Sequence, residues 1–296
     1  MERMTLNGIY KLKYFDYDTF HIENVMCDNF FPNDWIDANV PEDVHTTLRR
    51  YGYLSGHYYD KDLDQERWID EKDWVYFRSF VADERLYGHA CTLCLEGVDT
   101  LARVWLNGTL LGTCQNMFRE YTFPVGDALL FGQENRLVIQ VLSPLGHTAS
   151  TSKKGIYPED DATRMLLRKS QMNWGWDFCG HCLTVGLWKS IYLKTCDEAA
   201  LSDARLTTET LDAKEAKLHL SCTVQNGSAE DEVEIKLSAK GVPVCIHRLT
   251  ADEARDFSFT LKEPRPWWPR PYGDPFLYDV CIQLLHGGAT VDKKEF

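Results

Sequence analysis

The sequence predicts an all-β protein built from two sandwiches: a jelly-roll sandwich over residues 1–198 and an immunoglobulin-like β-sandwich over residues 199–296. Segments rich in aromatic and β-branched residues, which strands prefer, recur along the chain. From about residue 199, apolar and polar residues alternate in short segments at close spacing. At roughly 150 residues per domain, the length of 296 residues fits two domains, each large enough to bury a core.

Three strands are expected in the middle of the first region. Trp74–Phe80 is rich in aromatic and β-branched residues, and Leu101–Leu106 places Ala102, Val104 and Leu106 on one face. Asn107-Gly108 follows directly, and this pair is a strong hairpin signal because both residues tolerate positive φ. Arg136–Leu142 is apolar enough to predict a buried strand.

A long polar stretch separates these strands from the last one of the first region. Residues 143–171 show weak periodicity and are expected to form an extended loop, with a short helix at Ala162–Leu167. Loops of this length in compact domains are usually functional or disordered. Trp188–Leu193 then predicts a closing strand.

The second region predicts a sandwich of short strands. The expected strands are Ala204–Thr210, Ala216–Val224, Val233–Leu237, Val244–Leu249, Phe257–Leu261 and Phe276–Leu285. Many short strands in about 100 residues are typical of an immunoglobulin-like domain.

Composition and charge exclude some partners. The chain has 44% hydrophobic and 26% charged residues and a formal net charge of −13. Because no run of Lys or Arg offers a basic surface, neither nucleic acid nor an anionic membrane is an expected partner. The first residues contain no apolar segment of the kind found in secretory signals, and no segment approaches transmembrane length.

The ten cysteines are expected to be ordinary reduced thiols. Their density is far below that of a disulfide-rich scaffold and the sequence shows no secretory signal, so we expect a cytoplasmic protein without structural disulfides. We expect no bound metal either, because of the context of the two cysteine pairs. The pair Cys91 and Cys94 lies in a predicted strand, where positions three apart face opposite sides. Its distance in sequence from the second pair, Cys179 and Cys182, greatly exceeds the ~15–20 residues of a zinc ribbon.

Cys179-Gly180-His181-Cys182 spells the active-site sequence of a disulfide oxidoreductase. That chemistry places the first cysteine at a helix N-terminus after a strand. Here an aromatic-rich loop precedes it and a predicted strand, Leu183–Trp188, follows, so a redox role is not favoured.

Aromatic side chains are the most informative candidates for a binding site. Trp174-Gly175-Trp176-Asp177-Phe178 groups three aromatic rings around one carboxylate. Sugars stack on aromatic rings while charged groups bind their hydroxyls, but by chemistry alone a core cluster is an equal alternative. The same two interpretations apply to Trp267-Trp268-Pro269.

Six segments, in this order, resemble β-mannosidases of glycoside hydrolase family 2. They are Trp35–His45, Trp68–Phe80, Leu95–Gly108, Arg168–Asp177, Thr184–Trp188 and Trp267–Tyr278. Departures occur at Glu42, which replaces a usual Gly, and at Phe178-Cys179-Gly180, where the family usually carries Trp-Gly-Pro.

The resemblance implies a jelly-roll domain of the galactose-binding-like type and an immunoglobulin-like domain, which together precede a TIM barrel. The acid/base and nucleophile glutamates of the family lie on that barrel, so no catalytic residue, cofactor or metal is expected in this chain. Trp176 and Asp177 are expected to reach over the barrel mouth and bind the substrate's terminal sugar. Residues 289–296 are expected to form only the start of a last strand.

The expected function is therefore the non-catalytic part of a retaining exo-β-mannosidase. Its expected partners are the TIM-barrel domain and the terminal β-mannoside of an oligosaccharide. The alternatives are a stand-alone carbohydrate-binding module and a family 2 β-galactosidase, β-glucuronidase or exo-glucosaminidase. The Gly175-Trp176-Asp177 segment favours the mannosidase.

Overall fold

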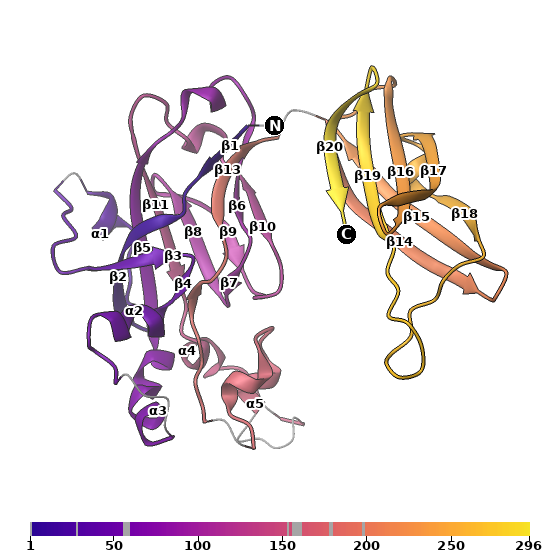
Figure 1. The fold of residues 1–296 in the computed structure, drawn as a ribbon. Helices are drawn as coiled ribbons and strands as arrows, with labels where there is room; N and C mark the ends of the chain where they lie inside the picture. Colours follow the sequence, from indigo (N-terminus) through magenta and orange to yellow (C-terminus); the bar gives the residue numbers. More distant parts are fainter. Residues whose placement is uncertain are drawn as a thin grey trace. The chain divides into compact units, whose positions relative to one another are not determined.

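The chain divides into two compact units, Met1–Thr195 and Cys196–Phe296, close to the boundary at residue 198 that the sequence predicts. The computed structural model describes residues 2–27, 29–55, 60–152, 154–155, 162–177, 180–196 and 199–296, with the backbone alone described for 60–62 and 162. Both units consist mainly of strands, which confirms the all-β prediction (Figure 1).

The first domain is a sandwich of two antiparallel sheets. One sheet has the order β1-β13-β6-β10, with strands β1 Arg3–Thr5, β13 Ile191–Thr195, β6 Cys91–Leu95 and β10 Tyr121–Pro124. The other has the order β3-β2-β5-β11-β8-β9, with strands β3 Ile36–Val40, β2 Gly8–Asp16, β5 Lys72–Val81, β11 Glu134–Val141, β8 Ala102–Leu106 and β9 Thr109–Cys114. A third, small sheet joins β4 Glu42–Asp43, β12 Gly186–Leu187 and β7 Val98–Asp99 in the order β4-β12-β7.

Apolar residues on both faces of β11 explain why its sequence shows no alternation. Leu137, Ile139 and Val141 face the core between the two sheets. Val138 lies in a second apolar cluster on the opposite face, where it is grouped with Phe77. The prediction of a buried strand at residues 136–142 is therefore confirmed.

The Asn107-Gly108 hairpin is also confirmed. It joins β8 to β9, and both turn residues have positive φ, 50° and 82°. The Asn107 side chain fixes the turn, because its Nδ2 donates to Ala128 O at 2.7 Å and its Oδ1 accepts from Arg136 N at 2.7 Å.

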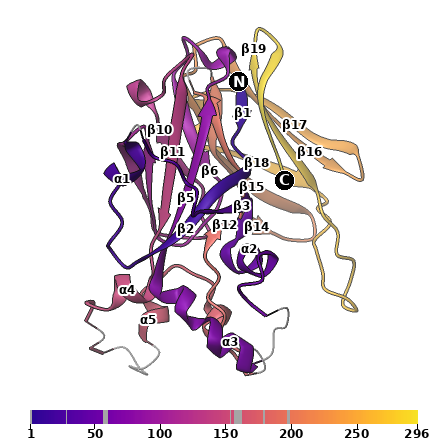
Figure 2. The same ribbon diagram turned by 90° about the vertical axis from the view of Figure 1, so that its left-hand side faces the viewer.

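Short helices gather at one end of the first sandwich, as both views show (Figures 1 and 2). They are α2 Val44–Arg50, α3 Asp60–Glu66, η1 Arg67–Glu71, α4 Pro144–Thr148, α5 Ala162–Met165 and η5 Gln171–Trp174. The predicted helix at residues 162–167 corresponds to α5. The other short helices among the described residues are α1 Glu23–Met26, η2 Glu84–Leu86, η3 Gly126–Ala128 and, in the second domain, η6 Glu253–Arg255. No helix in the described part of the chain is long and apolar enough to span a membrane.

The second domain pairs a three-stranded sheet with a four-stranded sheet. The first has the order β14-β15-β18, with β14 Ala200–Leu211, β15 Glu215–Gln225 and β18 Phe257–Lys262. The second has the order β17-β16-β19-β20, with β17 Val242–Thr250, β16 Asp231–Ala239, β19 Asp279–His286 and β20 Ala289–Glu295. Alternate residues of these strands, such as Val233, Ile235 and Leu237, form a separate core.

The last strand is paired over a longer stretch than the sequence predicts. β20 pairs with β19 from Ala289 opposite His286 to Glu295 opposite Cys281. Beyond the strand, Phe296 exchanges two backbone hydrogen bonds with Val280, at 2.8 and 3.0 Å. Residues 289–296 thus bond along most of β19, which is more than the start of a strand.

Candidate functional site

The predicted sugar-binding residues lie on an exposed loop that follows η5. The Trp176 side chain is 60% exposed and Asp177 is also exposed. Among the described residues, neither side chain has a hydrogen-bond or ion-pair partner. Both groups are therefore available to a ligand, which favours the binding interpretation over the core interpretation. Phe178 and Cys179, two of the departures from the family pattern, lie outside the described residues.

The two ends of this loop are bonded to each other. Cys182 N donates to Asn173 O at 2.9 Å, and Asn173 Nδ2 donates to Thr184 Oγ1 at 2.7 Å. The Trp174 ring meets the His181 ring edge-on, with centroids 6.1 Å apart. These contacts close a loop over residues 173–182, with Trp176 and Asp177 between its ends.

A buried ion pair anchors both ends of the loop to the sandwich. Lys169 Nζ lies 2.6 Å from Asp99 Oδ1, and each residue is only 3% exposed. The Lys169 ammonium also donates to Thr184 O. The Thr184 hydroxyl donates to Asp99 Oδ2 at 2.7 Å, and the Thr100 hydroxyl also donates to Asp99. Burial lowers the pKa of Lys169, and the Asp99 carboxylate opposes that effect.

Four of the segments that carry the family resemblance meet at this anchor. Asp99 comes from residues 95–108, Lys169 from residues 168–177 and Thr184 from residues 184–188. The fourth segment is residues 35–45. Its Asp43 pairs in the small sheet with Gly186, which pairs with Asp99 on its other side. Segments distant in sequence thus build one support for the loop.

A second polar pair lies beside the anchor. His181 Nε2 is 2.6 Å from Asp70 Oδ2, and Asp70 is 3% exposed. Burial raises the pKa of Asp70, while the hydrogen bond to His181 opposes that effect. The hydroxyl of Ser143 donates to Asp70 O at 2.6 Å, which ties η1 to the start of the 143–171 stretch. The sequence pattern predicted neither these two contacts nor the contacts of the Lys169–Asp99 pair.

The cysteine pairs show the environment of ordinary thiols where they are described. Cys91 and Cys94 lie in β6 and are buried, and burial raises the pKa of Cys94 to about 11. Burial also raises the pKa of Cys182 to about 11, which lowers its thiolate fraction and reactivity. Cys179 lies outside the described residues. The cytoplasmic location stays a prediction.

The core interpretation of Trp267 and Trp268 is wrong. They are 54% and 52% exposed, on the loop between β18 and β19. This loop is held by internal contacts: Trp268 N donates to Asp274 O at 2.9 Å, and Arg265 pairs with Asp274 at 2.9 Å. A Cβ on Gly273 would lie 2.6 Å from Trp268 Cβ, so the close turn needs glycine.

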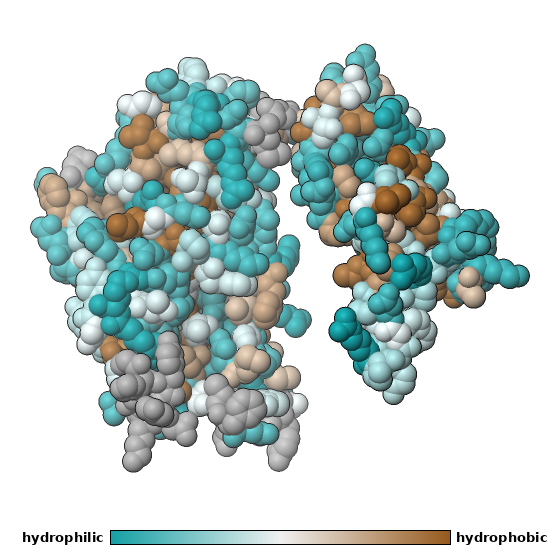
Figure 3. Space-filling model, in the orientation of Figure 1, coloured by the Kyte–Doolittle hydropathy of each residue, from teal (hydrophilic) through white to brown (hydrophobic). Residues whose placement is uncertain are grey.

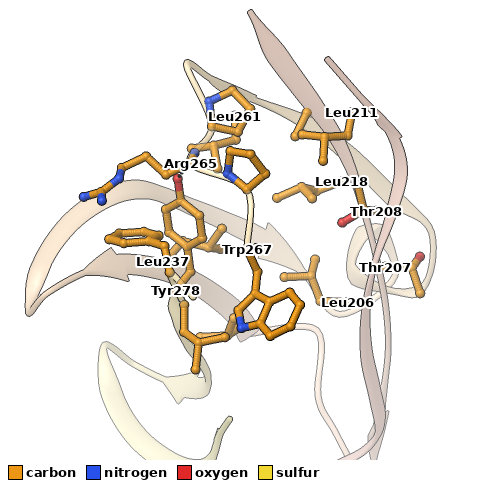
Figure 4. A pocket seen from close by; sticks show the side chains of 16 residues that line it. Leu206, Thr207, Thr208, Leu211, Leu218, Leu237, Leu261, Arg265, Trp267 and Tyr278 are labelled. Carbon is orange, nitrogen blue, oxygen red and sulfur yellow. Dashed lines mark hydrogen bonds between the residues drawn. The ribbon is translucent and has the colours of Figure 1, made fainter. Parts of the chain in front are cut away.

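The base of the same loop lines a cavity of about 280 Å³ in the second domain (Figure 4). Trp267 and Tyr278 from the loop and Leu206 and Leu218 from β14 and β15 are among its lining residues. Brown, apolar surface is visible on this domain in Figure 3. The lining is mostly apolar and holds no cluster of ionisable groups that could perform chemistry.

Both domains of the chain match known protein families. Residues 20–189 match the domain family described as glycosyl hydrolase 2 galactose-binding domain-like, and residues 199–296 match the family described as glycosyl hydrolases family 2. The chain therefore belongs to glycosyl hydrolase family 2.

Within that family, the chain is similar to β-mannosidases. It is 31% identical over 270 residues to β-mannosidase B of Aspergillus terreus, covering 86% of this chain and 31% of the relative. It is 29% identical over 265 residues to β-mannosidase B of Emericella nidulans, with the same coverage of 86% and 31%. The chain thus spans about a third of the length of these relatives.

Two solved structures of glycosidases are similar to this chain. β-D-Mannosidase from Dictyoglomus thermophilum matches with a TM-score of 0.80 and 28% identity, covering 100% of this chain and 36% of that one. A β-glucuronidase from Bifidobacterium dentium matches with a TM-score of 0.64 and 22% identity, covering 99% of this chain and 47% of that one. The second match shows the fold alone.

Proposed function

We propose that this chain is the non-catalytic part of a retaining exo-β-mannosidase, which hydrolyses terminal β-D-mannosyl residues. In this proposal a TIM-barrel domain supplies the acid/base and nucleophile carboxyl groups. The two sandwiches support that domain and contribute Trp176 and Asp177 to the sugar subsite. Sequence similarity to β-mannosidases of two fungi, at 31% and 29% identity, supports the choice of substrate.

The observation that carries the proposal is the combination of an open loop tip with a fixed loop base. Trp176 offers an exposed ring face and Asp177 an exposed carboxylate. A sugar stacks on such a ring, while a carboxylate accepts hydrogen bonds from its hydroxyls. The buried contacts of Lys169, Asp99 and Thr184 hold the loop base. Because the loop base is already ordered, the loop loses less conformational entropy when a sugar binds.

The buried carboxylates of this region have structural partners. Asp99 bonds to Lys169, and Asp70 bonds to His181. A retaining glycosidase needs two carboxyl groups about 5 Å apart on either side of the scissile bond, accessible to substrate. Buried and bonded carboxylates do not fit that role, so we propose that the chain alone hydrolyses no glycoside.

A hydrolysis screen tests this function. The pure chain and a longer protein that adds the catalytic barrel are each assayed with nitrophenyl β-mannoside, β-galactoside, β-glucuronide and β-glucosaminide. The proposal predicts turnover of the β-mannoside by the longer protein and no turnover by the chain alone. Turnover by the pure chain would overturn the non-catalytic role, and preference for another glycoside would overturn the mannosidase assignment.

A further inference from the structure

The first domain contains a cavity of about 450 Å³ with an aromatic wall. Tyr14 from β2, Trp68 from η1 and Trp74 from β5 form this wall together with Tyr53, which follows α2. The volume lies within the ~300–1,000 Å³ typical of small-molecule sites. Neither Trp176 nor Asp177 is among the lining residues, so this cavity is separate from the loop that carries the proposed function.

The aromatic wall is rigid at its base and open at its tip. Trp74 is 1% exposed, and its Nε1 donates to Ile69 O at 3.1 Å. The Tyr14 ring packs against Trp68 and Trp74, with centroids 5.3 and 5.6 Å away. Tyr14 is nevertheless 49% exposed and Tyr53 is 63% exposed. Ring faces that are fixed yet exposed form a surface on which the apolar face of a ligand can stack.

Free polar groups accompany the rings. Among the described residues, the hydroxyls of Tyr14 and Tyr53 and the indole N–H of Trp68 have no hydrogen-bond partner. The ion pair of Lys13 and Asp34 also lines the cavity, with side chains 34% and 69% exposed. The ammonium keeps further donor protons and the carboxylate keeps further lone pairs for a ligand.

This set of groups selects for a neutral ligand that both donates and accepts hydrogen bonds. Asp34 would repel an anion and Lys13 would repel a cation, while an apolar ligand would leave the charged pair without new partners. A sugar presents an apolar C–H face to aromatic rings and hydroxyls to the surrounding polar groups. We propose that this cavity is a second saccharide site, separate from the Trp176–Asp177 loop, which binds a neutral oligosaccharide.

Calorimetric titration of the 296-residue chain with β-1,4-mannotriose and with cellotriose tests the proposal. The expected result is binding of at least one trisaccharide, weakened about tenfold by Tyr53→Ala and a few-fold by Tyr53→Phe, which removes only the hydroxyl. Tyr53 is suitable because its side chain is mostly exposed and its removal should leave the fold intact, which circular dichroism verifies. Tyr272→Ala is the matched control, because Tyr272 is 81% exposed in the second domain and does not line the cavity, and it is expected to leave this binding unchanged.

Each other outcome overturns the second site. If neither trisaccharide binds, or if Tyr53→Ala binds as tightly as the wild type, the cavity is not a saccharide site. If Trp176→Ala abolishes binding while Tyr53→Ala does not, the loop alone binds the sugar. If the chain binds no saccharide but dimerises in sedimentation, and Tyr53→Ala restores the monomer, the cavity is an interface between two copies.

Discussion

Lys169 Nζ and Asp99 Oδ1 lie 2.6 Å apart in a position where both side chains are almost completely buried. Asp99 belongs to the small sheet of the first domain, and Lys169 precedes η5, which leads into the loop of Trp176 and Asp177. Because the pair also bonds to Thr184 on the far side of the loop, it holds both loop ends. Removing either partner would leave a buried charge without compensation.

Lys169→Met is therefore expected to destabilise the first domain by about 3–5 kcal/mol, the usual cost of breaking a buried pair. Adding Asp99→Asn should cost less than the sum of the two single changes, because the second change removes the uncompensated charge. The measurement is the free energy of unfolding in urea. Lys11→Met is the matched control, since Lys11 Nζ and Asp37 Oδ1 are 2.7 Å apart but the side chains are 40% and 45% exposed. It should cost less than about 1 kcal/mol. A cost for Lys169→Met as small as that of the control would refute the anchor.

His45 predicts a pH dependence of stability. It is buried, and burial lowers its pKa to about 4 in the folded state. The unfolded chain binds the proton near pH 6.5, so stability falls as pH decreases from about 6.5 toward 4. Between pH 7.5 and 5, the wild type should lose about 2 kcal/mol more than His45→Gln. Asp70, whose raised pKa has the opposite effect, is present in both proteins and cancels in the difference.

The comparison of urea unfolding at these two pH values checks the His45 prediction. Asp43, Arg49, Lys169 and Asp99 are the charged groups that act on His45, and all of them remain in the variant. Equal pH dependence of the two proteins would show that His45 is protonated as readily in the folded chain as in the unfolded one.

Gly186, in the small sheet, should not tolerate a side chain. Its φ is +145°, and an added Cβ would lie 2.8 Å from the Tyr76 hydroxyl and 3.0 Å from Glu42 O. Backbone strain and overpacking together predict a cost of about 2–5 kcal/mol for Gly186→Ala. Gly132→Ala is the control, because Gly132 has a φ of +67° with nothing within 4 Å, and it should cost only the strain, about 1–2 kcal/mol. Equal unfolding free energies of the two variants would exclude the steric contribution.

Local features of this fold could be predicted from the sequence, and long-range features could not. The turn at Asn107-Gly108 was predictable because two adjacent residues determine its geometry. The sequence also marked Trp176 and Asp177, since they stand together in a resembling segment. Lys169 and Asp99 lie far apart in sequence, and no local pattern reports which buried lysine meets which aspartate. A signal that could have marked this site was the charged Asp99 between Val98 and the predicted strand Leu101–Leu106.

The exposure of Trp267 and Trp268 could not be predicted from the sequence either. Hydrophobicity alone made Trp267 and Trp268 equally compatible with a core, but the loop that carries them folds on its own contacts, outside the sandwich. Likewise, the aromatic wall around Tyr14 could not be predicted, because it combines residues from strands, a helix and a loop.

In the proposed function, Asp177 binds sugar and does not hold the fold. The direct test measures kcat/KM for a β-mannoside in the barrel-containing protein and the melting temperature of this chain, each with and without Asp177→Ala. Loss of charge-assisted hydrogen bonds worth roughly 1.5–3 kcal/mol predicts a fall in kcat/KM of about 10- to 150-fold. The melting temperature should change by only a few degrees, because the exposed carboxylate has no partner among the described residues. Strong destabilisation of the chain, with unchanged kcat/KM of the folded enzyme, would contradict the claim and make Asp177 a structural residue.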